Sequence, residues 1–148
     1  GRHLFHQPRP LILDSSLSIP IKSHVVRPGT IIFTACLAKK KIAQKEQFIL
    51  LGCDVIEIKT EKNGYLNLDE ILKILAKRGI SSIMVEGGPK VWSDFLRQGF
   101  VDEFMIYLAP KVLGTGVQTF QDGDIASRKI NVREVRKFGN DLYWNGFL

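Results

Sequence analysis

The chain has 148 residues, of which 45% are hydrophobic and 24% charged, a balance typical of one globular domain with a sizeable core. Its longest apolar runs fall far short of the roughly 20 residues that a membrane-spanning helix needs, and no secretory signal pattern is present. We therefore expect a cytoplasmic protein without a membrane partner, and the formal net charge of +6 suits an anionic ligand.

The first half of the chain alternates apolar runs with turn residues. Residues 1–10 contain two prolines and no periodicity, so we interpret them as a loop. Pro20 excludes a central strand from the segment around it. The remaining runs predict strands at residues 11–13, 30–34 and 54–58, and a helix at residues 39–51 that ends at Gly52.

The strongest helix pattern covers residues 68–78. Its apolar residues recur with helical spacing, and Gly79 ends it. Asn67 and Glu70 have the spacing of a capping box, in which each side chain bonds the backbone N–H of the other. No chemistry is apparent on this helix, so we interpret it as scaffold.

The centre of the chain holds the candidate site. Residues 83–85 form a short apolar run that predicts a buried strand, and this run ends at Glu86-Gly87-Gly88. Pro89 suits the first position of the helix that follows, which ends near Gly99. Glycines before a helix N-terminus let an anion approach the backbone N–H groups.

The C-terminal third predicts an antiparallel edge. Residues 103–108 form a strand, and the glycine-containing segment 111–124 has no period, so we expect a long loop. Residues 131–138 and 142–147 flank Gly139-Asn140-Asp141 and predict a hairpin. The whole order predicts an α/β fold, a mostly parallel sheet flanked by helices with an antiparallel C-terminal hairpin.

Several kinds of chemistry find no support in the sequence. His3, His6 and His24 have no partner at metal-ligand spacing, so we expect no metal. G-x-S-x-G, the P-loop and G-x-G-x-x-G before a helix are all absent, which leaves a bound cofactor as the route to an enzyme. The basic residues near position 40 are not interleaved with aromatic residues, so we expect no nucleic-acid partner. Cys36 and Cys53 lie in apolar surroundings, which favours buried thiols in a reducing compartment.

Three sequence blocks carry a resemblance to a known family. They read Val85-Glu86-Gly87-Gly88-Pro89, then Phe95-Leu96-x-x-Gly99-x-Val101-Asp102-Glu103, then Tyr107-Leu108-Ala109-Pro110-Lys111-Val112-Leu113-Gly114. Together with Leu13-Asp14-Ser15-x-Leu17-x-Ile19-Pro20, they strongly resemble the reductase domain of the bifunctional riboflavin-biosynthesis deaminase–reductase. That domain is related in fold to dihydrofolate reductase.

The resemblance implies an NADPH-dependent reduction of 5-amino-6-(5-phosphoribosylamino)uracil to its ribitylamino product. By position, Glu86 would bind the substrate, and Ser15 would contact the cofactor. The loop and helix start that would hold the NADP phosphates comprise Gly88, Pro89, Lys90, Val91, Trp92, Ser93 and Asp94. The rings of Trp92 and Phe95 themselves fit a core better than a stacking surface. The alternative for Glu86 is a helix-start carboxylate that accepts hydrogen bonds from backbone N–H groups.

The resemblance also implies a domain organisation and a homodimer. We expect residues 1–148 to be a reductase domain that lacks the family's N-terminal strand and helix and its upstream deaminase domain. The C-terminal hairpin is a candidate dimer contact. Two alternatives stay open: another dihydrofolate-reductase-like NADPH reductase that acts on a pterin or a sugar imine, and a non-catalytic binding or dimerisation remnant.

Overall fold

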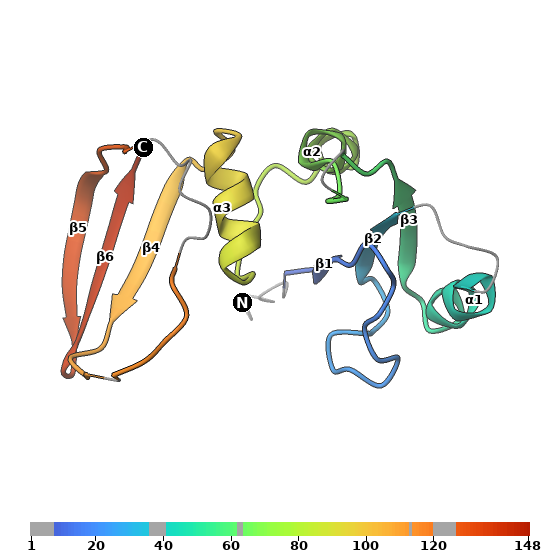
Figure 1. Ribbon diagram of the computed structural model, residues 1–148, viewed down its shortest axis with the longest axis horizontal. Helices are drawn as coiled ribbons and strands as arrows, with labels where there is room; N and C mark the ends of the chain where they lie inside the picture. The colour runs from blue at the N-terminus through green and yellow to red at the C-terminus, as the bar shows by residue number, and fades with distance from the viewer. Residues whose placement is uncertain (1–7, 36–40, 62–63, 113, 120–126) are drawn as a thin grey trace, which may run out of the picture. The chain divides into compact units, whose positions relative to one another are not determined.

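The computed structural model describes residues 8–35, 41–61, 64–112, 114–119 and 127–148 (Figure 1). They divide into two compact units, Gly1–Ser81 and Ser82–Leu148. The first unit contains β1 (Leu11–Leu13), β2 (Ile31–Ala35), α1 (Ile42–Leu50), β3 (Asp54–Ile58) and α2 (Leu68–Lys77). The second contains α3 (Pro89–Arg97), β4 (Glu103–Leu108), β5 (Asn131–Phe138) and β6 (Asp141–Phe147). These elements confirm the predicted mixed α/β class.

The first unit is built on a parallel sheet of order β1-β2-β3. β2 is central, because Ile31 pairs with Leu11 on one side and with Asp54 on the other. Residues 31–34 of this strand are all buried, as expected for a parallel strand with both faces covered. Figure 1 shows α1 and α2 on opposite sides of β3. Phe48 of α1 packs in a core cluster with Leu17, Ile32 and Cys53.

The start of α2 confirms one half of the predicted capping box. The Asn67 side chain accepts a hydrogen bond from the Glu70 N–H at 2.8 Å. The return bond is not made, because the Asn67 N–H donates instead to the Lys59 carbonyl at 3.2 Å. The Glu70 carboxylate therefore does not complete the capping box.

The turn after β1 is fixed by a carboxylate and by a buried leucine. Asp14 accepts hydrogen bonds from the Ile19 N–H at 2.7 Å and from the Ser18 hydroxyl at 3.1 Å. Leu17 lies between Asp14 and Ser18 in the sequence, has a φ of 51° and is fully buried. A left-handed backbone at a leucine is costly, so its burial must outweigh the strain.

The second unit is built on an antiparallel sheet of order β4-β6-β5. The β5–β6 hairpin is confirmed, with Phe138 paired to Asp141 across Gly139-Asn140. Gly139 has a φ of 59° and Asn140 does not have a positive φ, which is the pattern of a type II′ turn. The helix α3 covers one face of the sheet, where Trp92 stacks on Phe104 with ring centroids 6.4 Å apart.

The predicted buried strand at residues 83–85 is wrong. Residues 82–88 form no strand, and Met84 is 71% exposed. A short apolar run becomes a strand only when a neighbouring strand supplies hydrogen-bond partners. No described residue pairs with this segment, so its apolar composition alone did not suffice.

The remaining boundaries agree within a few residues. Residues 1–7, Cys36, the lysines at 39 and 40, and parts of the loop predicted at 111–124 lie outside the described residues. The rest of that loop contains neither helix nor strand. Within the described chain, no helix has the length and apolar character that crossing a bilayer requires.

Candidate functional site

The Gly88 corner opens α3 as predicted. Gly88 is the N-cap residue, Pro89 occupies the first turn, and the Trp92 N–H makes the first helical bond to the Gly88 carbonyl at 3.2 Å. No side chain caps this N-terminus, and its first turn holds no acidic residue. The N–H groups of a first turn have no partner inside the helix and carry partial positive charge, so this end of α3 suits an anion.

The two glycines of the corner serve different purposes. A Cβ on Gly87 would lie 2.8 Å from the Val91 Cβ, so packing within the unit requires a glycine there. A Cβ on Gly88 would meet nothing within 4 Å, and its φ of −71° suits any residue. Since neither packing nor backbone geometry accounts for Gly88, the close approach of a ligand is a reason for glycine at that position.

Glu86 is exposed beside this corner. Among the described residues, its carboxylate makes no hydrogen bond or ion pair, and it does not cap α3. The alternative of a helix-start carboxylate bonded to backbone N–H groups is therefore not what these residues show. The carboxylate is available to a ligand that offers hydroxyl or N–H donors.

The side chains of α3 mostly serve the unit itself. Phe95 is buried, which confirms that its ring belongs to the core, whereas Trp92 is half-buried and stacks on Phe104. Ser93 is fully buried, and Asp94 forms an ion pair with Arg97 at 2.8 Å. Lys90 is exposed and Val91 half-buried. A ligand at this corner would therefore meet mainly main chain and the Lys90 side chain.

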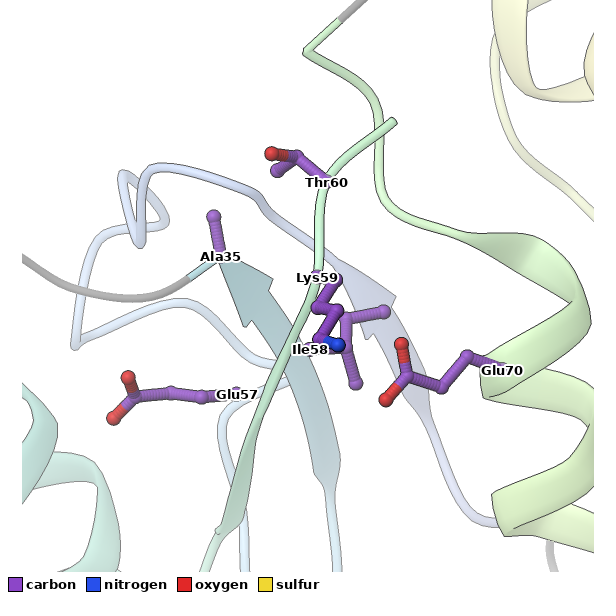
Figure 2. A pocket seen from close by; sticks show the side chains of 6 residues that line it. All are labelled: Ala35, Glu57, Ile58, Lys59, Thr60 and Glu70. Atoms are coloured by element: carbon purple, nitrogen blue, oxygen red, sulfur yellow. The ribbon is translucent and has the colours of Figure 1, made fainter. Parts of the chain in front are cut away.

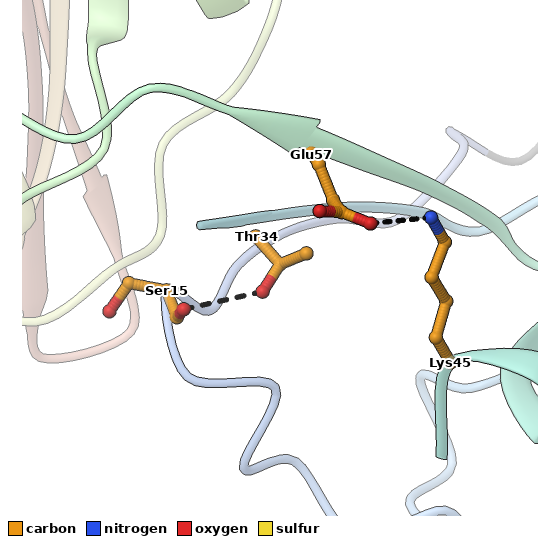
Figure 3. Close-up of polar contacts among 4 residues, drawn as sticks. All are labelled: Ser15, Thr34, Lys45 and Glu57. Carbon is orange, nitrogen blue, oxygen red and sulfur yellow. Dashed lines mark hydrogen bonds and ion pairs between the residues drawn. The ribbon is translucent and has the colours of Figure 1, made fainter. Parts of the chain in front are cut away.

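Ser15 lies in the first unit, at the carboxyl end of β1 (Figure 3). Its carbonyl accepts hydrogen bonds from the Ala35 N–H at 3.2 Å and from the Thr34 hydroxyl at 3.3 Å. Its side chain is exposed. The bonds hold Ser15 at the carboxyl edge of the parallel sheet, which is the edge where open α/β sheets bind ligands. Whether Ser15 and the Gly88 corner contact one ligand stays a prediction.

A cleft of about 600 Å³ lies at the same edge and was missed by the sequence analysis (Figure 2). Its walls come from the ends of β2 and β3 and from α2: Ala35, Glu57, Ile58, Lys59, Thr60 and Glu70. Glu57 forms an ion pair with Lys45 of α1 at 2.6 Å (Figure 3). The sequence contained one signal for this cleft: Lys59 and Thr60 are polar residues directly after a predicted strand. The carboxyl ends of parallel strands meet at one edge of the sheet, so such residues are expected to lie there.

The cysteine and metal expectations can be placed only in part. Cys53 is a buried free thiol, and burial raises its pKa while a hydrogen bond to the Arg27 carbonyl opposes that rise. Cys36, His3 and His6 lie outside the described residues. Within the described part of the chain, no three His, Cys, Asp or Glu residues are grouped as metal ligands.

Comparison with known proteins shows the family to which the chain belongs and several proteins of similar sequence. The family model of the RibD C-terminal domain matches residues 2–144. The riboflavin biosynthesis protein RibD of Aquifex aeolicus is 34% identical over 145 residues, which cover 92% of this chain and 37% of that protein. The 2,5-diamino-6-ribosylamino-4(3H)-pyrimidinone 5′-phosphate reductase of the same organism is 32% identical over 130 residues, covering 85% and 56% respectively. The chain thus spans less than two thirds of either relative.

A solved structure supports the fold. The pyrimidine reductase-like protein of Corynebacterium diphtheriae superposes with a TM-score of 0.77 at 20% identity, covering 95% of this chain and 60% of that one. At this identity, the likeness concerns the fold. It confirms the predicted dihydrofolate-reductase-like α/β fold class.

Proposed function

Because this chain belongs to the RibD C-terminal domain family, we propose that it performs the reductase step of riboflavin biosynthesis. The proposed reaction is the NADPH-dependent reduction of 5-amino-6-(5-phosphoribosylamino)uracil to the ribitylamino product. NADPH, when bound, supplies the hydride for the first ribosyl carbon. The observation that carries the proposal is Gly88, an N-cap glycine with open space at its Cβ position, at the start of α3, where no side chain caps the helix.

The residues of the corner have separable tasks. Main-chain N–H groups at the start of α3 bind the cofactor phosphates, and Gly88 keeps side-chain bulk away from them. Glu86 accepts hydrogen bonds from substrate hydroxyls or ring N–H groups, which orients the sugar carbon for hydride transfer. Ser15 contributes a further cofactor contact from the edge of the parallel sheet.

A second substrate is favoured by one finding. The reductase of Aquifex aeolicus is named for a diaminopyrimidinone phosphate, the same kind of compound with an amino group in place of a ring carbonyl. Glu86 can accept a hydrogen bond from either compound. We therefore treat the uracil and the diaminopyrimidinone as the two substrates to compare.

A substrate panel tests the proposal. The full 148-residue chain is incubated with NADPH and the ribosylaminouracil phosphate, the diaminopyrimidinone phosphate or a dihydropterin, and loss of NADPH absorbance is followed. We expect consumption with a ribosylamino compound. Consumption with the dihydropterin alone would indicate the other reductase. Binding of NADPH without turnover on any substrate would indicate a non-catalytic module.

We also propose that the protein is a cytoplasmic homodimer, with the open face of the β4-β6-β5 sheet as the interface. This face presents a cluster of aromatic rings in which Tyr107 and Tyr143 lie 4.9 Å apart, and Tyr107 is 67% exposed. A second copy would cover these rings. Sedimentation analysis should find a dimer that Tyr107→Glu weakens, and a wild-type monomer at all concentrations would contradict it.

The basic residues of β5 do not argue for a nucleic-acid partner. Arg136 pairs with Glu134, and the Arg133 guanidinium lies 5.6 Å from the centre of the Phe147 ring. Both arginines are thus engaged within the sheet.

A further inference from the structure

The loop after β1, residues 14–19, is held at three points. The Asp14 carboxylate accepts the Ile19 N–H at 2.7 Å and so closes the loop on itself. The Ser15 carbonyl accepts two hydrogen bonds from the end of β2. In the middle of the loop, the Leu17 carbonyl accepts a hydrogen bond from the Lys41 ammonium at 3.3 Å. Lys41 is the N-cap residue of α1, so this last bond fastens the loop to a separate element of the same unit.

The Lys41 side chain is itself fixed. It is half-buried, and its ammonium also donates to the Gln44 side chain at 2.8 Å. Among the described residues, Lys41 forms no ion pair. A lysine side chain loses much rotamer freedom when it is fixed, so its bond to an uncharged carbonyl needs a reason. The conformation of Leu17, which carries that carbonyl, gives the reason.

Leu17 has a left-handed backbone, with a φ of 51°. This conformation is strained in a leucine and persists only where surrounding contacts impose it. The Leu17 side chain is fully buried in the cluster that contains Phe48 of α1, and Lys41 holds its carbonyl from the start of the same helix. Backbone strain of this kind is concentrated at ligand-binding sites. It therefore points to a function for the loop.

The strained loop presents two exposed serines. Ser15 and Ser16 follow β1 at the carboxyl edge of the parallel sheet, and both side chains are exposed. Figure 3 shows the Ser15 carbonyl directed at Thr34, while the Ser15 hydroxyl points away from that bond. Because the backbone is held on both sides, the position of this hydroxyl depends only on the χ1 torsion of Ser15.

We infer that Lys41 is a positioning residue for the cofactor, which keeps the Ser15 hydroxyl in place by holding the Leu17 carbonyl. Lys41 acts through the loop and does not touch the cofactor, because two acceptors already occupy its ammonium. This role rests on the proposed function, in which Ser15 contacts NADPH. A binding group must be held close to its productive geometry, and bonds from neighbouring residues achieve this.

A double-mutant cycle between Lys41 and Ser15 tests the inference. NADPH is titrated calorimetrically into the full 148-residue chain as wild type, Lys41→Met, Ser15→Ala and the double variant. Methionine keeps an unbranched side chain but cannot donate a hydrogen bond. Lys41→Met should weaken NADPH binding about three- to tenfold, the value of one hydrogen bond. In the Ser15→Ala background it should have no further effect, because both residues act through one contact.

Two controls separate positioning from charge and from stability. The titrations are made at about 0.5 M NaCl, which screens the long-range attraction between a lysine and the cofactor phosphates. Lys77→Met removes the same group from an exposed position in the last turn of α2 and should leave NADPH affinity unchanged. Hydrogen exchange at the Ile19 N–H should become faster in Lys41→Met, since the loop is then held at fewer points.

Unchanged NADPH affinity in Lys41→Met or in Ser15→Ala would overturn the inference. A loss from Lys41→Met that is as large in the Ser15→Ala background as in the wild type would do the same, since it would show a general structural effect. A wild-type chain that does not bind NADPH would also overturn it. The expected coupling without NADPH oxidation on any ribosylamino substrate would instead sustain the role of Lys41 and remove the proposed reaction.

Discussion

The two units bury their sheets to very different extents. In the first unit, residues 31–34 of the central strand are all buried, whereas in the second unit every residue of β5 except Glu134 is exposed. The central strand of the first unit thus forms part of a closed core. In the second unit, the Glu86 carboxylate makes no hydrogen bond or ion pair among the described residues, and a Cβ on Gly88 would meet nothing within 4 Å, so packing does not account for either side chain. Where packing explains little, an unusual residue carries more information about function.

Truncation of a buried side chain in the first unit gives the largest expected effect, and an exposed position in the second unit serves as its comparison. Phe33→Ala removes a fully buried ring from β2 and should lower the free energy of unfolding by about 3–5 kcal/mol. Val135→Ala, at a position 64% exposed on β5, should change it by less than about 0.5 kcal/mol. Urea denaturation measures both. Similar losses would show that the second unit is as tightly packed as the first.

Glu86→Gln examines whether the unengaged carboxylate serves a ligand. It should lower kcat/KM by roughly 10- to 100-fold, the value of a hydrogen bond to a charged group, with unchanged NADPH affinity and stability. Glu46→Gln, an exposed carboxylate on α1, is the control and should have no effect. Steady-state kinetics and cofactor titration separate the two properties. A parallel loss of NADPH affinity would assign Glu86 to the cofactor.

The two corner glycines should respond in opposite ways. Gly87→Ala brings a Cβ to 2.8 Å from Val91 and should cost about 1–3 kcal/mol of stability through overpacking. Gly88→Ala has open space, so it should spare stability and weaken NADPH binding. Thermal unfolding with and without NADPH distinguishes them. A stable Gly88→Ala variant with wild-type affinity would remove the main support for a phosphate site there.

The smallest expected effect concerns the closed core of the first unit. Burial raises the pKa of the Cys53 thiol, so the unfolded chain loses that proton at a lower pH than the folded one. The free energy of unfolding should therefore fall as pH rises above the usual thiol range, and Cys53→Ala should flatten this fall. Alkylation of the folded chain, mapped by peptide, should be slow at Cys53 and fast in urea. Fast labelling when folded would show that the core opens.

Local patterns predicted the elements that local chemistry determines. Asn67 caps α2, Pro89 opens α3, and Gly139 turns the hairpin, each for a reason visible within a few residues. The segment at 83–85 depended instead on a distant strand for its hydrogen bonds. A three-residue apolar run contains no information about whether such a partner is available.

The candidate site was predictable where it is contiguous in sequence. Glu86 and Gly88 stand together, so composition and order sufficed to single them out. The cleft joins Ala35, Lys59 and Glu70 from three separate elements, and only the register of the parallel strands brings them to one edge. The helix that contains Glu70 was interpreted as scaffold, because no chemistry is apparent on it from the sequence alone.

The strained turn at Leu17 has a consequence for ligand binding. Asp14 and the buried leucine fix the backbone on either side of Ser15 and Ser16 through contacts within the fold itself. The conformational entropy of this loop is lost when the protein folds, so a nucleotide that contacts Ser15 does not have to order it. The entropic cost of ordering this loop belongs to the folding step, so the free energy of nucleotide binding does not include it.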